Sequence, residues 1–443
     1  MDDYFVEKIV AMLFSLLILC LAWITSRFAK SWLVPSVVFS VFWFLYSFIP
    51  LIFLPSVPVN AIAVVYIFVF CSVFSLSAYF FNWKYARRIF DTNKVKGDKI
   101  AILDTLFIRG TFVFIQGFVI FSIFLDVIIQ GFSFFDLFFN FMQTSSAYIS
   151  LRYSGELIES IIVRLGTVFT YVGVMLGGFV VCFSSGMRNK IIVTIFSLLP
   201  SILLMVIQGA KGAVFLCIFL FYGSVLIYNM HHSNTNLINR QTIKIFLFGI
   251  VLLIPAVVSS FLSRGLYDHD LDFILKRLAY YLNSYAFAHL YAFSDWFNAY
   301  LGKESIMEYD FDAEVGYGFY TFMSLFRVFG VDRYVPPGVY EEYYMYKDIM
   351  QSNIYTFFRG LITDFGILGS IIFAFVFGWL LNLLYYGINI VKNPNFLIAA
   401  YIAMFGFYYT SFIISIFIWN SLPVSLLIFY FIIAFNQFSI SKA

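Results

Sequence analysis

Charged residues are scarce in this chain of 443 residues, where Asp, Glu, Lys and Arg together make up only 12%. Hydrophobic residues reach 62%, aromatic residues 22%, and mean hydropathy is +0.91. Soluble globular domains carry about 25% charged residues, so the composition excludes that class. A net charge of +3 also gives no basis for a nucleic-acid surface. The chain is therefore expected to lie in a membrane.

Cysteine and nucleotide-binding motifs are also lacking. The four cysteines, Cys20, Cys71, Cys182 and Cys217, all fall inside apolar runs, which excludes a disulfide framework in the polar segments. No GxxxxGK[ST] motif is present, so nothing favours a bound nucleotide. We expect no cofactor.

Apolar runs of about 17 to 25 residues recur along the chain, the length that a helix needs to cross a bilayer. We predict eleven spans, near 6–26, 33–54, 59–81, 106–129, 163–184, 191–208, 212–229, 245–262, 365–388, 396–417 and 420–438. The predicted fold is thus an all-α polytopic membrane protein, with residues 1–443 forming a single integral membrane domain.

Basic residues indicate how these spans are oriented. Short loops rich in Lys and Arg stay on the cytoplasmic side, and such loops alternate with turns that have almost none. This predicts an outer N-terminus and a cytoplasmic C-terminus. The first run has an acidic lead and no small-residue cleavage site, so it is expected to be a retained span rather than a signal peptide.

Two polar segments then face outward, a smaller loop at 130–162 and a large loop at 263–352. The large loop holds 13 of the chain's 24 acidic residues. Because it lacks cysteine, it must be held by packing on the helices. Its ring-rich stretches are typical of amphipathic interfacial helices, so we expect it to be partly helical.

The segment 353–369, NIYTFFRGLITDFGILG, joins the large loop to an apolar span and is the first candidate site. Helical spacing puts Asn353 and Asp364 on one face and Tyr355 and Arg359 on a neighbouring one. Charged groups near hydrocarbon are functional by default. The alternative is an ordinary helix start, with Asn353 or Thr356 as its cap and with Gly366 and Gly369 allowing close helix packing.

Two more cations are candidates for binding an anion. Arg264 stands where the eighth span ends, and its guanidinium could hold a phosphate through paired N–H donors, or simply reach the interface. Lys211 lies in a turn flanked by Gly209 and Gly212, whose small size lets backbone amides approach an anion. An anchor that fixes the topology would also explain Lys211.

Within the large loop, Tyr281 and Arg327 belong to the ring-rich stretches and could contact sugars, although an aromatic belt at the membrane surface explains such rings equally well. His289 is a candidate for proton transfer, with a structural contact as the alternative.

Three cations, Lys211, Arg264 and Arg359, together with the Asp364 carboxylate suggest a site for an amphiphilic anion. A lipid-linked diphosphate sugar fits, since cations stabilise the negative charge that builds up on a departing diphosphate. A flippase for the same lipid is a competing interpretation, but it would place charges near the bilayer midplane and show paired repeats. A membrane acyltransferase would favour a site centred on histidine.

The sequence NIYTFFRGLITDFGILG, with the preceding GYGFYTF block and the large outer loop, resembles the bacterial O-antigen polymerases, the Wzy family. The family elements Asn–Tyr–Thr and Asp–Phe–Gly correspond to Asn353, Tyr355, Thr356 and to Asp364, Phe365, Gly366. Where relatives often carry Arg, this chain has Lys211, which keeps the charge but loses the paired donors.

The resemblance implies a metal-independent GT-C-type glycosyltransferase of the bacterial inner membrane. It would transfer a growing glycan from undecaprenyl diphosphate to the non-reducing end of a new lipid-linked repeat unit at the periplasmic face. A chain-length regulator and a flippase of the same pathway are the expected partners. Arg264 and Arg359 would hold the diphosphate with help from Lys211. Asp364, a loop acid or His289 would be the general base, and Asn353, Tyr355, Arg327 and Tyr281 would contact substrate.

Overall fold

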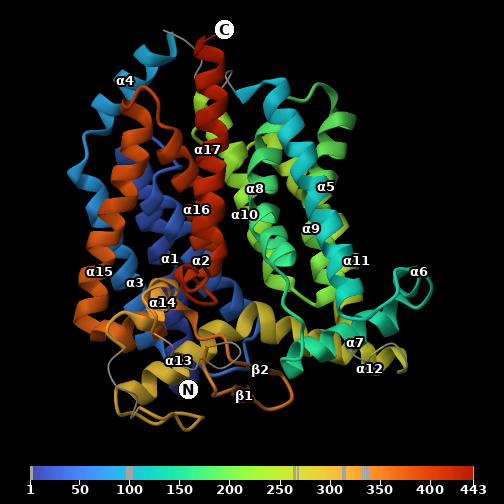
Figure 1. Ribbon diagram of the computed structural model, residues 1–443. Helices are drawn as coiled ribbons and strands as arrows, with labels where there is room; N and C mark the ends of the chain where they lie inside the picture. The colour runs from blue at the N-terminus through green and yellow to red at the C-terminus, as the bar shows by residue number, and fades with distance from the viewer. Residues whose placement is uncertain are drawn as a thin grey trace. The chain divides into compact units, whose positions relative to one another are not determined.

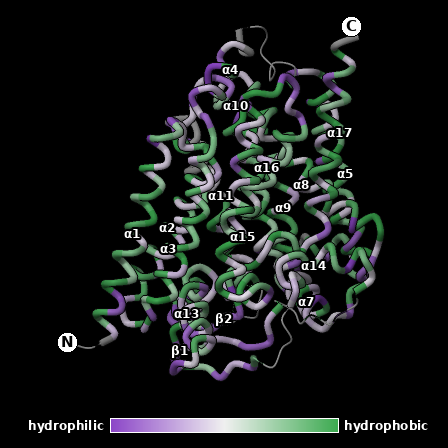
Figure 2. Tube along the Cα trace, turned by 90° about the vertical axis from the view of Figure 1, so that its left-hand side faces the viewer, coloured by the Kyte–Doolittle hydropathy of each residue, from purple (hydrophilic) through white to green (hydrophobic). Residues whose placement is uncertain are grey.

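The computed structural model describes residues 3–95, 103–262, 266, 269–311, 316–331, 333, 335 and 339–442. In this part of the chain nearly all regular structure is helical (Figure 1). The predicted all-α class is therefore confirmed, and the apolar helices make the chain a multi-pass membrane protein. The long helices are hydrophobic along most of their length, and polar segments such as α4 gather at their ends (Figure 2).

The helices are α1 (Asp3–Ala29), α2 (Pro35–Phe53), α3 (Ala61–Leu76), α4 (Trp83–Val95), α5 (Leu106–Ile129), α6 (Asp136–Phe139), α7 (Phe141–Ser154), α8 (Ile161–Phe183), α9 (Gly186–Gln208), α10 (Lys211–His231), α11 (Arg240–Leu262), α12 (Leu271–Leu282), α13 (Ala288–Tyr300), α14 (Phe319–Val328), α15 (Thr356–Ile390), α16 (Asn395–Thr410) and α17 (Ser421–Lys442). Strands β1 (Tyr344–Tyr346) and β2 (Met350–Ser352) form an antiparallel hairpin with Tyr344 opposite Ser352.

Nine helices among the described residues are long and apolar enough to cross a membrane, and each matches a predicted span. The other two predicted spans correspond to α11 and α16. Helix α16 has 16 residues, a length of about 24 Å at 1.5 Å per residue, less than the roughly 30 Å of hydrocarbon. The total of eleven spans therefore stays a prediction.

The chain divides into two compact units, although no linker or change in composition marks the division in the sequence. The first unit comprises Met1–Phe90, Lys276–Ile390 and Phe407–Asn420, and the second comprises Asp91–Leu275, Val391–Gly406 and Ser421–Ala443. This division does not test the prediction of a single membrane domain, which stays a prediction.

In the first unit α1, α2, α3 and α15 pack side by side (Figure 1). Small and polar residues hold them together, as expected where lipid provides no hydrophobic drive between helices. A Cβ at Gly378 would lie 2.7 Å from the Phe74 carbonyl oxygen, so α15 approaches α3 closely. Nearby, the Asn382 amide donates to the hydroxyls of Ser36 at 2.7 Å and Ser77 at 2.9 Å.

Aromatic rings form the core of this unit at the start of α15. The Phe358 ring lies 4.4 Å from both Trp43 and Phe357, and Phe39 stacks on Phe74 at 4.5 Å. Such contacts add to the free energy of burial and fix ring geometry. The core therefore fixes the backbone that carries Arg359.

The N-terminal end of α1, helices α13 and α14 and the β hairpin all lie at one end of the first unit, and α4 lies at the other (Figures 1 and 2). Lys8 stabilises the first of these ends. Its ammonium donates to the carbonyls of Leu54, Pro55 and Val57 at 2.6 to 2.8 Å, where α2 ends. Helix α4, the most basic segment of this unit, is thus separated from α13 and α14 by the length of the long helices.

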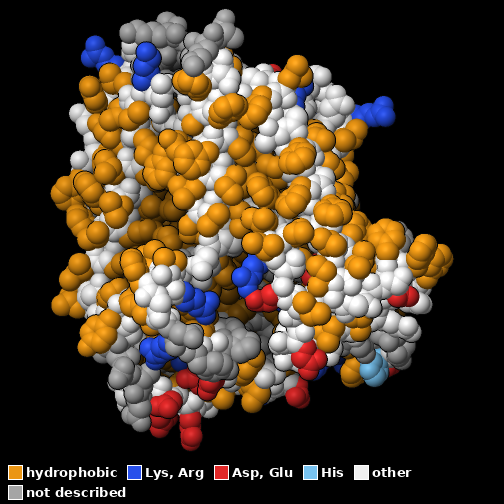
Figure 3. All heavy atoms as spheres, viewed as in Figure 1, with side chains coloured by type: hydrophobic (Ala, Val, Ile, Leu, Met, Phe, Trp, Pro, Cys, Tyr) orange, Lys and Arg blue, Asp and Glu red, His pale blue; other side chains and the backbone are white. Residues whose placement is uncertain are grey.

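In the second unit α8 is central and contacts α5, α9, α10 and α17. A Cβ at Gly178 of α8 would lie 2.5 Å from the Phe221 carbonyl oxygen of α10, so only glycine allows this approach. Helix α7 crosses the end of α9, and α11 also packs on α9. On the face drawn in Figure 3, hydrophobic side chains cover the helices and charged ones gather toward helix ends.

Candidate functional site

Arg359 lies in the first turns of α15. It is the most enclosed cation at the end of the first unit that holds α13, α14 and the β hairpin. Its Nη2 donates to the Glu342 carboxylate at 2.9 Å. Four aromatic rings surround the guanidinium carbon, with centroids 4.0 Å away for Tyr340, 4.4 Å for Tyr355, 5.4 Å for Trp296 and 5.7 Å for Tyr309. Cation–π attraction of this kind strengthens as water is removed. The guanidinium is thus held before any ligand binds.

The ion pair leaves part of the guanidinium unsatisfied. Arg359 is 5% exposed, and its Nη1 is buried without a hydrogen-bond partner. Glu342, in contrast, keeps 23% of its side chain exposed. An unmatched donor on a buried charge is costly, so its presence calls for an explanation. The guanidinium therefore has a donor left for one more acceptor atom.

A chain of hydrogen bonds extends from this pair. The Tyr355 hydroxyl donates to the Glu342 backbone carbonyl at 3.1 Å and also bonds to Tyr309. The Tyr309 hydroxyl donates to Asp295 at 2.9 Å. Burial raises the pKa of Asp295, while the amides of Ile306 and Met307, which donate to it, act in the opposite direction. Burial also raises the pKa of Tyr355 to about 12, so this hydroxyl is neutral at physiological pH.

Asp364 is held by the start of α14. Its carboxylate accepts from the Tyr320 amide at 3.1 Å, the Thr321 amide at 2.7 Å and the Thr321 hydroxyl at 2.6 Å. These amides belong to the first turn of α14, so a residue of α15 caps the N-terminus of α14. Asp364 is 2% exposed and all its contacts hold α14 in place. A general base needs access to a substrate hydroxyl, and the role of Asp364 as the base stays a prediction.

His289 is also held by protein. Its Nε2 lies 2.9 Å from the Tyr46 carbonyl oxygen, and its ring packs edge-on against Phe412 at 4.9 Å. Burial lowers the pKa of His289 to about 4, despite the opposing effect of backbone carbonyls at Tyr46 and Ala286. With 1% exposure, the ring is a neutral core group. The structural alternative to proton transfer therefore fits its position.

The start of α15 corrects the predicted helical faces. The helix begins at Thr356, so Asn353 lies in the connection after β2 and does not share a helical face with Asp364. Thr356 has φ +68°, a strained value for a β-branched residue, and its hydroxyl accepts from the Phe358 amide at 3.3 Å. The Phe357 amide donates to the Ser411 carbonyl at 3.0 Å. Of the two residues predicted as the cap, Asn353 and Thr356, it is thus Thr356 that caps the helix.

Gly366 does not serve helix packing, because a Cβ there would meet nothing within 4 Å. Its φ of 68° and ψ of 178° interrupt α15 instead, in a backbone region that essentially only glycine adopts. The expectation of a packing glycine is therefore wrong at this position, and the residue marks a break in the helix.

Lys211 lies in the second unit as the first residue of α10, directly after a turn in which Gly209 has φ +67°. Its ammonium lies 4.1 Å from the centroid of the Phe261 ring on α11. Arg264 lies outside the described residues. The predicted grouping of Lys211, Arg264 and Arg359 into one site thus stays a prediction.

The two remaining predicted contacts lie in the first unit. Tyr281 is on α12, where the Arg277 guanidinium carbon lies 5.3 Å from its ring centroid. Arg327 is in the last turn of α14 and is exposed. Neither has a contact with Arg359 among those described, so their role in binding substrate stays a prediction.

Sequence reasoning missed Glu342 as the partner of Arg359. It also missed the bonded series of Asp295, Tyr309 and Tyr355. Glu342 stood among many acids of the large loop, and no spacing rule links it to a residue 17 positions later. The one available signal was a buried-looking arginine that needed a counter-charge.

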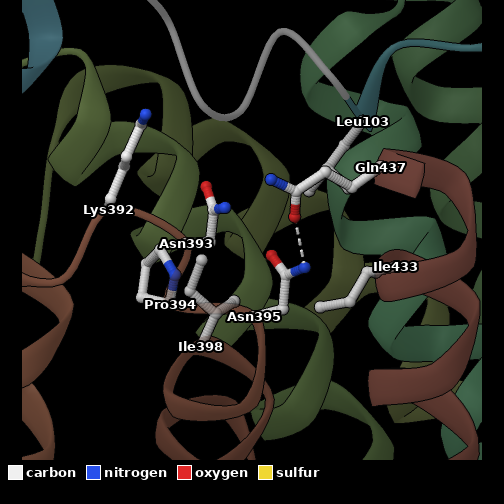
Figure 4. Close-up of a pocket in the computed structure, with 8 residues that line it drawn as sticks. All are labelled: Leu103, Lys392, Asn393, Pro394, Asn395, Ile398, Ile433 and Gln437. Atoms are coloured by element: carbon white, nitrogen blue, oxygen red, sulfur yellow. Dashed lines mark hydrogen bonds between the residues drawn. The ribbon is translucent and has the colours of Figure 1, made fainter. Parts of the chain in front are cut away.

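A pocket lies elsewhere, in the second unit, lined by residues around the start of α16 and by α17 (Figure 4). Asn395 donates to the Gln437 side chain there at 2.5 Å, and Lys392 stands at the rim. No residue predicted for the site lines it.

Among the described residues, no three His, Cys, Asp or Glu side chains are grouped so that they could hold a metal ion. Comparisons with protein-family models, with curated proteins and with solved structures found no match.

Proposed function

We propose that this chain is a polysaccharide polymerase of the O-antigen type. It would be a metal-independent glycosyltransferase that moves a growing glycan from undecaprenyl diphosphate to the non-reducing end of a new lipid-linked repeat unit. The proposal includes a GT-C-like bundle of eleven spans in the bacterial inner membrane, with the active site at the periplasmic face, the N-terminus on that side and the C-terminus in the cytoplasm.

The observation that carries the proposal is the guanidinium of Arg359. It is buried, fixed by four rings and paired with Glu342 through Nη2, while Nη1 has an unmatched donor. A diphosphate offers several oxygens, two of which can accept from the parallel N–H donors of a planar guanidinium. It would displace the Glu342 carboxylate, which is the more exposed partner of the pair. Negative charge growing on the leaving diphosphate is then stabilised by a cation whose position four rings already fix.

The same displacement supplies a base. Once released from Arg359, the Glu342 carboxylate is free to accept the proton of the acceptor hydroxyl. The hydroxyl oxygen bonds to the anomeric carbon, the bond from that carbon to the phosphate oxygen breaks, and its electron pair stays on undecaprenyl diphosphate. In this assignment Glu342 is the loop acid among the three base candidates, and Asp364 and His289 hold the surrounding elements.

Lipid-linked oligosaccharide is both donor and acceptor, and a chain-length regulator and a flippase of the same pathway are the expected protein partners. A transporter or an acyltransferase would need different chemistry at Arg359. Transport alone has no use for a base beside the cation, and acyl transfer has no diphosphate leaving group.

Reconstitution of the purified full chain in vesicles with a lipid-linked repeat unit tests the proposal. We expect a ladder of glycan lengths without added nucleotide, together with release of undecaprenyl diphosphate in equal amount to the bonds formed. Movement of the lipid across the bilayer without new glycosidic bonds would identify a flippase. Acylated glycan formed from an added acyl donor would identify an acyltransferase.

A further inference from the structure

The smaller polar segment, 130–162, folds against the turn that carries Lys211. Within it, α7 lies across the end of α9. The Ser145 hydroxyl donates to the Val206 carbonyl at 2.7 Å, and Arg152 Nη1 donates to the Gln208 carbonyl at 2.8 Å. These carbonyls are among the last four of α9, which have no partner within the helix. Helix α7 thus completes the end of α9.

A buried carboxylate joins the same elements from the other side. Asp126 of α5 is 2% exposed, and its Oδ2 accepts from the Tyr148 hydroxyl at 2.5 Å and from the Gln208 side chain at 2.7 Å. Gln130 donates to its Oδ1 at 3.1 Å. Charge-assisted hydrogen bonds of this kind are about twice as strong as neutral ones. One carboxylate therefore ties α5, α7 and the last residue of α9 together.

The tied residue, Gln208, stands three positions before Lys211. Between them Gly209 has φ +67°, and a Cβ there would lie 3.2 Å from the Ile149 side chain of α7. The path of the backbone from Gln208 to Lys211 is thus set on one side by Asp126 and on the other by α7. Lys211 stands at the first position of α10, the positive end of the helix dipole, where a bound anion would offset the repulsion.

We propose that Asp126 is a positioning residue, which acts through Gln208 and α7 to hold Lys211 where it contacts the diphosphate of a polyprenyl lipid. The inference rests on the proposed function for the identity of that anion. It gives the smaller polar segment a part in substrate binding, which its sequence did not suggest.

Binding of undecaprenyl diphosphate to the full chain in lipid nanodiscs tests the inference without turnover. We expect Lys211→Gln and Asp126→Asn each to weaken binding about tenfold, the effect of losing one interaction of about 1.4 kcal/mol. The double variant should bind no more weakly than the weaker single variant, because Asp126 acts through Lys211. Ser425→Ala is the control, since it removes buried hydrogen bonds of the second unit, including one to the Val168 carbonyl at 2.9 Å, far from this turn in the chain.

Two further variants keep the test usable if Asp126→Asn does not fold. Gln208→Met keeps the length of the side chain but removes the donor to Asp126, and it should weaken binding like Asp126→Asn. Tyr148→Phe leaves the contact between Asp126 and Gln208 intact, so its effect should be smaller.

Wild-type affinity in Asp126→Asn, or in Gln208→Met where the former does not fold, would overturn the inference. So would losses that simply add in the double variant, which is the behaviour of a residue that only stabilises the fold. A chain that binds undecaprenyl diphosphate through Lys211 yet forms no glycan ladder would refute the polymerase and leave this inference standing. If the wild type does not bind undecaprenyl diphosphate, the inference about Asp126 and Lys211 is refuted.

Discussion

Arg359 and Lys211 show two ways of fixing a cation in a membrane protein, one through contacts of the side chain and one through contacts of the backbone turn. Arg359 is fixed through its own side chain, by Glu342 and four rings. Lys211 has one ring, Phe261, against its ammonium, while its backbone turn is clamped by α7 and Asp126. Substitutions at Arg359 should therefore act locally, whereas the position of Lys211 should respond to residues that never touch it.

The largest effect is expected at Arg359. Arg359→Ala should abolish long glycan chains, because it removes the charge that stabilises the leaving diphosphate and leaves Glu342 without its partner. Glycan length distributions from reconstituted vesicles measure this, with membrane insertion checked by blotting. Arg359→Lys keeps the charge without the fork and should retain a small part of the activity. Unchanged chain lengths in Arg359→Ala would remove this residue from the site.

Glu342→Gln should lower kcat by about a hundredfold, within the range for loss of a general base. Its KM for donor should stay equal or fall, since a neutral amide competes less strongly for Arg359. Initial-rate kinetics separate the two parameters. A KM that rises in proportion to the loss of kcat/KM would instead mean that Glu342 contacts the substrate in its ground state.

Acid should affect the first unit through His289. Its pKa in the folded chain, about 4, lies below the value of 6.5 for an exposed histidine, so the unfolded chain binds the proton first as pH falls. The stabilising contribution is complete above about pH 6.5 and is lost toward pH 4, up to about 3 kcal/mol. Hydrogen exchange in α13 should rise over this window, and His289→Gln should remove the dependence. Equal acid sensitivity at the Lys211 turn would contradict the assignment to His289.

Asp364→Asn should destabilise α14 by about 1–2 kcal/mol, the usual cost of a lost N-cap. Faster hydrogen exchange at residues 319–328 would report it, with exchange in α7 as the internal reference. Polymerisation should persist wherever the protein remains folded. A folded Asp364→Asn protein without any polymer would restore Asp364 as the base.

The smallest effect is expected at Lys211, where Lys211→Gln should weaken the binding of donor about tenfold. Lys211→Arg should bind at least as well as wild type, because the turn fixes the backbone and the guanidinium presents two parallel N–H donors to the diphosphate. Affinity for undecaprenyl diphosphate measures both. If Lys211→Arg bound as poorly as Lys211→Gln, the shape of the lysine rather than its charge would matter.

Local sequence patterns predicted individual helices of the fold well. The span 106–129 coincides with α5, and the ring-rich stretches of the large loop form α13 and α14. The length of an apolar run and the residues that cap a helix are local properties, so both can be predicted from a single sequence.

Contacts across long separations could not be predicted in the same way. Asp364 bonds to Thr321, 43 positions away, and Gln208 to Asp126, 82 positions away. No periodicity links such pairs, because tertiary packing alone brings them together. The same holds for Glu342, whose importance follows from its position beside Arg359 and not from its surroundings in the chain.

The break at Gly366 has a consequence for the match between protein and bilayer. Uninterrupted, the 35 residues of α15 would extend about 52 Å, far beyond the hydrocarbon thickness, and would have to tilt strongly. The part from 367 to 390 alone is about 36 Å long and spans with modest tilt. Residues 356–364, almost all buried in protein, are then released from matching the bilayer. The setting of Arg359 should thus stay the same in membranes of different thickness.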